Sequence, residues 1–147
     1  MLKMFSFFQG HHEAQRTPDF NFQNALDEHV RWKLHFEAAL RVEGMGYSES
    51  QLMLGGGTDL SSWLQQVTSS NPLVADLRES VVHFNTAAAQ ALGLAKSGDH
   101  ASAHKVVASG EYLHESKRIK RLLVELEMQR LHVPPAIEMR REKVAVA

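Results

Sequence analysis

The sequence contains no cysteine and carries a formal net charge of only −1 with histidine neutral. Without cysteine the chain has no disulfide, no thiolate metal ligand and no thiol nucleophile, which is compatible with a reducing cytoplasm. A net charge so close to zero supplies no general attraction to nucleic acid or to an anionic membrane. No apolar run approaches the roughly 20 residues of a transmembrane helix, and no segment alternates convincingly with the period of a β-strand. We therefore expect a cytoplasmic, all-α protein without a membrane span or a nucleic-acid partner.

The 147 residues suffice for one domain with a sizeable core. We expect an irregular leader over 1–16, a helical bundle over 17–131 and a C-terminal tail over 132–147. The leader is apolar at its start but too short for a signal-peptide core with a cleavage site. The periodicity predicts an antiparallel four-helix bundle that contains one short helix. Its helices are expected near residues 18–43, 59–68, 72–96 and 99–131, with a short helical turn near 48–54.

Capping residues and helix breakers set these boundaries. Small polar residues and proline favour the first turn of a helix, whereas glycine and proline favour its end. Gly110 is a weak point inside the last helix, because glycine is a poor helix former. The expected start signals are Thr17-Pro18-Asp19, Thr58 or Asp59, Pro72 and Asp99, and the expected stop signals are Gly44, Gly46, Ser97-Gly98 and Pro134-Pro135.

His29 stands inside the apolar stripe of the first expected helix. A buried histidine needs partners for its ring nitrogens, since an unpaired buried polar group costs about 1–3 kcal/mol. The favoured interpretation is a hydrogen-bonded core histidine, and a metal ligand is the main alternative. The stripe around His29 consists of Phe22, Ala25, Leu26, Trp32, Phe36, Ala39 and Leu40.

The helix expected over 72–96 also has a well-defined inner face, with Asn85 beside it. His83 falls on the opposite face, together with Glu79 and Gln90, so we expect it to be exposed and replaceable. The inner stripe consists of Val74, Leu77, Val81, Phe84, Ala88, Ala91 and Ala95, and the last helix repeats the pattern with Tyr112, Ile119, Leu123 and Leu126.

No catalytic pattern is visible in the sequence. Glu111-x-x-His114 is the only Glu-x-x-His pair, whereas a di-iron carboxylate site needs two such pairs on facing helices. The glycine triplet at 55–57 lacks both a preceding strand and the Lys-Ser/Thr of a phosphate-binding loop. His100, His104 and His114 lie among exposed polar residues and are expected at the surface. We therefore predict that the protein is not an enzyme.

Several of these residues resemble the chemoreceptor zinc-binding (CZB) domain. The resemblance begins with His29-x-x-Trp32-Lys33 and continues with Leu60-x-x-Trp63-Leu64 in a short helix. It covers roughly residues 18–128 and includes Phe84 and Ala88, then Ser97-Gly98-Asp99, Ala103, Gly110 and Tyr112. Such domains are cytoplasmic helical bundles, attached to bacterial chemoreceptors or diguanylate cyclases or occurring alone.

The family's zinc ligands can be carried over position by position. They are a histidine on the first helix, a cysteine before the Trp-Leu pair, and two histidines four residues apart on the third helix. In this chain those positions carry His29, Thr58, Val81 and Asn85, so three of the four ligands are changed. Valine cannot coordinate a metal, and a hydroxyl and an amide are weak replacements.

The resemblance therefore implies a CZB-like domain that has lost the zinc site of the family. We expect a regulatory or scaffold role in bacterial signalling, related to chemotaxis or cyclic-di-GMP, with a homodimer or a signalling protein as partner and no cofactor. We also expect a core polar cluster of His29, Thr58 and Asn85, in which His29 is neutral near pH 7 and held by Asn85 or Thr58. The alternative is a sensor of zinc or another metal that uses His29 with unorthodox ligands such as Asp59 or His83.

Both tryptophans fall on apolar stripes, so we expect Trp32 and Trp63 to anchor the core rather than to stack against a ligand. Truncating a buried tryptophan to alanine typically costs about 3–5 kcal/mol. We predict that Trp63→Ala lowers the midpoint of denaturant unfolding. An unchanged midpoint would show that Trp63 does not contribute to the core.

Overall fold

The computed structural model describes residues 20–132, and this part of the chain is all-α, as the sequence predicts. The expected leader over 1–16 and the tail beyond His132 lie outside the described residues. Within them, every helix is too short or too polar to cross a bilayer. The helices are α2 (Phe22–Leu40), α3 (Glu49–Met53), α4 (Asp59–Gln66), α5 (Pro72–Lys96), α6 (His100–Ala108) and α7 (Gly110–His132).

Side-chain caps determine where α2 to α6 begin. Asn21 accepts a hydrogen bond from the backbone N–H of Asn24, so the described part of the first helix begins at Phe22 rather than at residue 18. The expected signal Thr17-Pro18-Asp19 lies outside the described residues. Capping satisfies backbone donors that have no partner within the helix. The other capping residues are Ser48, Thr58, Asn71 and Asp99.

The single helix expected over 99–131 is wrong, because the chain breaks between α6 and α7. Ser109 is extended, with φ −158° and ψ −179°, and Gly110 has a positive φ of 68°. Residues with a Cβ rarely adopt a positive φ, whereas glycine does so readily. The glycine that the sequence marked as a weak point is therefore the point at which one helix ends and the next begins.

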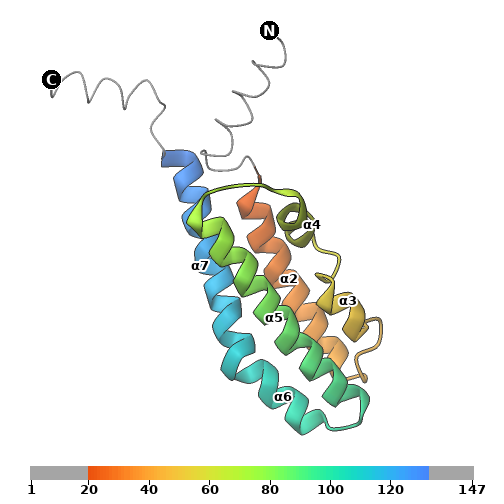
Figure 1. Cartoon of the computed structure of the whole chain (residues 1–147). Coiled ribbons are helices and arrows are strands. Elements are labelled where there is room, and N and C mark those ends of the chain that lie inside the picture. The colour runs from red at the N-terminus through yellow and green to blue at the C-terminus, as the bar shows by residue number, and fades with distance from the viewer. Residues whose placement is uncertain (1–19, 133–147) are drawn as a thin grey trace, which may run out of the picture.

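Three long segments form the body of the molecule. Figure 1 shows α2 and α5 running in the same direction and α7 running antiparallel to both, while α3 and α4 carry the chain back from the end of α2 to the start of α5. A side-chain hydrogen bond agrees with the antiparallel arrangement of α5 and α7. Asn71, next to the start of α5, donates to Gln129 near the end of α7, at 2.9 Å.

The core is centred on α5, which packs against each of the other helices. Its C-terminal half buries a row of alanines, whose small side chains let neighbouring helices approach closely. All members of the expected inner stripes of α5 and α7 are buried except Val81, which is partly buried. The buried alanines are Ala87, Ala88, Ala89, Ala91 and Ala95.

Trp32 and Trp63 pack against the core from its edge rather than at its centre. Trp32 stacks on Phe36, with ring centroids 4.8 Å apart. Trp63 stacks on Phe20 at 4.6 Å and meets Phe22 edge-on at 5.5 Å. Trp63 thus covers the start of α2 and Trp32 lies near its middle, and both indoles remain partly exposed.

A buried polar pair crosses the core between α5 and α7. Glu115 is 5% exposed and Ser80 is fully buried. The Ser80 hydroxyl donates to Oε2 of the Glu115 carboxylate, and Nη1 of Arg118 lies 3.7 Å from the same oxygen. A buried carboxylate that loses such a partner loses a charge-assisted hydrogen bond that water does not readily replace.

We predict that Ser80→Ala lowers the free energy of unfolding by about 1–3 kcal/mol, because it removes this donor from a buried carboxylate. Thr86→Ala is the matched control, since the exposed Thr86 hydroxyl donates only to the Val82 carbonyl of its own helix. Its effect should stay within about 0.5 kcal/mol. Equal effects of the two substitutions in urea titrations would contradict the structural role of Ser80.

Candidate functional site

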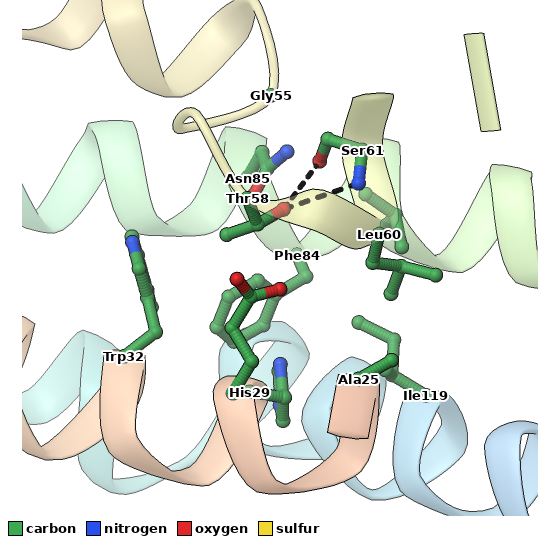
Figure 2. A pocket seen from close by; sticks show the side chains of 12 residues that line it. Ala25, His29, Trp32, Gly55, Thr58, Leu60, Ser61, Phe84, Asn85 and Ile119 are labelled. Carbon is green, nitrogen blue, oxygen red and sulfur yellow. Dashed lines mark hydrogen bonds between the residues drawn. The ribbon is translucent and has the colours of Figure 1, made fainter. Parts of the chain in front are cut away.

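A small pocket beside His29 joins the positions that sequence reasoning singled out. His29, Thr58, Val81 and Asn85 all line it. Figure 2 shows His29 on α2, Thr58 at the start of α4 and Asn85 on α5, with Ile119 of α7 behind the histidine. The pocket encloses about 30 Å³ of space open to a water-sized sphere, which is room for a water molecule or two rather than for an organic ligand.

His29 is 8% exposed, and its hydrogen-bond partner is not the expected one. Its Nε2 lies 2.9 Å from the Oγ of Ser116 on α7, and its ring packs against Phe84 at 5.0 Å. The expectation that Asn85 or Thr58 holds the ring is therefore wrong. Those two residues approach the histidine from the pocket side, whereas Ser116 belongs to the helix on which His29 packs.

Burial, together with the positive charges of Lys33 and Lys120, lowers the pKa of His29 from 6.5 to about 3. The charged imidazolium would lose its hydration and meet two like charges without a carboxylate to compensate. His29 is therefore neutral at physiological pH, as expected from its place on the apolar stripe. A neutral ring offers one donor and one acceptor, of which the Ser116 hydroxyl uses one.

Thr58 is held by its own helix. Its Oγ1 accepts the Ser61 backbone N–H at 3.1 Å and donates to the Ser61 hydroxyl at 3.0 Å, as the dashed lines in Figure 2 show. The neighbouring Asp59 N–H donates to the carboxylate of Glu28, which ties the start of α4 to α2. Thr58 therefore acts as the cap of α4, and its hydroxyl is already paired.

Asn85 differs from the other polar residues of the pocket. It is 9% exposed, and within residues 20–132 its side chain makes no hydrogen bond. Its polar atoms are nevertheless not sealed off, since no enclosed side-chain nitrogen or oxygen of the described residues lacks a partner. The amide reaches the space of the pocket and of a larger groove outside it. His29, Thr58 and Asn85 thus share a pocket but are not joined by hydrogen bonds.

His83 lies outside this pocket, on the side of α5 that faces α7. Its side chain is 45% exposed, and its Nδ1 is 3.7 Å from a carboxylate oxygen of Glu111 and 3.9 Å from one of Glu115. It is thus half-exposed and close to two carboxylates, rather than simply solvated. His100, His104 and His114 are exposed, as expected.

Sequence reasoning missed Ser116, although a signal for it was present. Ser116 lies four residues after Tyr112 and three before Ile119, so it falls on the apolar stripe of α7 as His29 does on that of α2. Ser80 lies between Leu77 and Phe84 in the same way on α5. A polar residue at an inner position of each long helix indicates that it finds a polar partner across the core. His29 pairs with Ser116, and Ser80 pairs with Glu115.

The residues present do not fit the zinc site of the CZB family. Val81 has no donor atom, the Thr58 hydroxyl is engaged in its cap, and Asn85 offers only a neutral amide. The alternative ligands Asp59 and His83 do not line the pocket. Among residues 20–132, no three His, Cys, Asp or Glu side chains lie close enough together to hold a metal ion.

No protein-family model, curated protein or solved structure matches the chain. The interpretation of the site therefore rests on the geometry described above.

The lowered pKa of His29 predicts a particular dependence of stability on pH. Between pH 6.5 and about 3 the unfolded chain binds a proton that folded His29 does not, so acid favours unfolding. The contribution of His29 is fully present above pH 6.5 and is lost as the pH falls, by up to about 1.4 kcal/mol per pH unit. His29→Gln, which retains an amide for Ser116, should remove this slope from denaturant titrations. His83→Gln should retain it, and an unchanged slope in His29→Gln would contradict the assignment.

Proposed function

We propose that the protein is a non-catalytic regulatory or scaffold domain, organised as an antiparallel four-helix bundle of the CZB kind without the zinc site. Its setting would be cytoplasmic bacterial signalling, related to chemotaxis or to cyclic-di-GMP. One observation carries the proposal: the four positions at which the family's ligands would fall all line the pocket beside His29.

The convergence of these positions supports the alignment with the family independently of the residue types. They come from α2, from the loop before α4 and from α5, and the intervals between them are 29, 23 and 4 residues. A shift of one residue on α5 would place Val82, which is 56% exposed, and Thr86, which is also exposed, at the positions of the family's histidines. Neither residue lines the pocket.

The contents of the pocket support a role through surfaces rather than through chemistry. Its polar side chains include a neutral histidine held by Ser116, a capping threonine, the Ser61 hydroxyl bonded to that threonine, an amide and the carboxylate of Glu28. This set provides no nucleophile paired with a base. Apolar side chains are instead exposed at helical spacing on α7, where Val124, Met128 and Leu131 form a stripe. Such a stripe suits a second copy of the chain or a signalling partner.

We predict that restoring the three lost ligands creates a zinc site. The combined variant Thr58→Cys, Val81→His and Asn85→His, with His29 unchanged, should bind about one zinc per chain in a tetrahedral site. In the control, Val82→His and Thr86→His replace the two substitutions on α5, so both new histidines point away from the pocket. Elemental analysis after dialysis should find zinc in the first variant alone.

The native chain should contain far less than one zinc, and added zinc should leave its melting temperature unchanged. Equal zinc contents in the two variants would contradict the alignment with the family. About one zinc per native chain, lost in His29→Gln, would instead favour the metal-sensor alternative.

A further inference from the structure

A groove of about 450 Å³ lies outside the His29 pocket, between the end of α3, the inner side of α4 and α5. Its volume falls within the range of small-molecule sites, about 300–1,000 Å³. Gly55, Ser61, Val81 and Asn85 line both the groove and the pocket. The groove and the His29 pocket therefore adjoin each other and share these four residues.

The walls of the groove combine apolar side chains with polar ones, and several of the apolar side chains are open to solvent. Met53 is 56% exposed, Leu54 is 75% exposed and Val82 is 56% exposed. Leu64 and Val67 of the α4 segment form the facing wall. Three of the large exposed apolar side chains of the described residues thus gather around one concave surface, a combination typical of a ligand site rather than of scattered surface residues.

Asn85 places an unpaired amide at the floor of this groove. Asn85 is 9% exposed, and no hydrogen bond joins its side chain to any other residue in 20–132. The amide is not sealed off from water, so a ligand in the groove that brings a hydrogen-bonding group replaces water at the amide. Because the amide carries both a donor and an acceptor, a hydroxyl or a carbonyl would satisfy it.

Arg78 places a fixed cation at the rim of the groove. Its Nε and Nη2 donate to the Leu64 carbonyl at 3.3 and 2.9 Å, and Nη2 also donates to the Val67 carbonyl at 3.2 Å. These bonds orient the guanidinium at the end of α4. No carboxylate of the described residues lies within ion-pair distance of it, and its Nη1 makes no hydrogen bond there. The guanidinium is thus positioned to donate hydrogen bonds to an anionic partner.

Arg78 and Asn85 are seven residues apart on α5, so they lie on nearly the same face and are separated by about 10 Å along the helix axis. We propose that the groove binds a medium-chain aliphatic carboxylate that carries a hydrogen-bonding group at its far end. The carboxylate pairs with Arg78, the chain covers Met53, Leu54 and Val82, and the distal hydroxyl or carbonyl meets Asn85. This site does not depend on the family resemblance or on the alignment of its zinc ligands.

Isothermal titration calorimetry of the full chain with three probes tests the assignment of each group. The probes are decanoate with a terminal hydroxyl, decanoate itself, and decanol. The hydroxylated carboxylate should bind with one-to-one stoichiometry and most tightly. Arg78→Gln should weaken both carboxylates about tenfold or more and weaken decanol much less, because the charge-assisted pair forms only with the carboxylates, whereas the loss of the Arg78 hydrogen bonds to Leu64 and Val67 affects all three probes alike. Asn85→Leu should reduce the affinity of the hydroxylated probe to that of decanoate.

Val82→Glu provides a test that does not disturb the packing of α4, since Val82 is exposed on the groove wall. The added carboxylate should abolish binding of both anionic probes. Val124→Glu makes the same change at an exposed site of α7 and should leave the binding of both probes unchanged. Saturable binding that Val82→Glu and Val124→Glu affect equally would overturn the proposal. So would the absence of saturable binding of all three probes to the native chain below their micellar concentrations.

Discussion

Two adjacent residues of α7 hold both of the other long helices. The side chain of Glu115 accepts a hydrogen bond from Ser80 of α5, and the side chain of Ser116 pairs with His29 of α2. Consecutive residues of an α-helix point about 100° apart, so one helix can meet two neighbours in this way. Moving α7 by one turn, about 5.4 Å, would leave four buried polar side chains unpaired. The apolar contacts around them are less selective, because hydrophobic attraction has no direction.

This arrangement determines the position of the pocket and what it can do. Because Ser116 holds His29 from the side of α7, Nε2 of the ring already has a partner before any group approaches from α4 or α5. Burial keeps the ring neutral, so it adds no charge to a site that contains no metal ligand set. His29 thus needs no metal ion to satisfy its Nε2, since Ser116 of α7 supplies a partner.

Asn85 links the two recesses on which the functional proposals rest. Its amide belongs both to the inner pocket beside His29 and to the outer groove below Arg78. A ligand that binds in the groove would contact α3, α4 and α5 together, and α4 is a short helix tied to its neighbours through the Arg78 and Glu28 hydrogen bonds.

Much of this structure could be read from local sequence. The helix from Pro72 to Lys96, the cap formed by Thr58 and the inner position of His29 depend on backbone geometry and on the spacing of apolar residues, which act within a few residues of chain. The partner of His29 could not be read in this way, because Ser116 lies 87 residues away and the pair forms only at one relative height of two antiparallel helices. The break at Gly110 was visible as a weak point, but whether the helix continued through it depended on the packing of α6. The groove likewise depends on how α3, α4 and α5 lie relative to one another, which no single segment encodes.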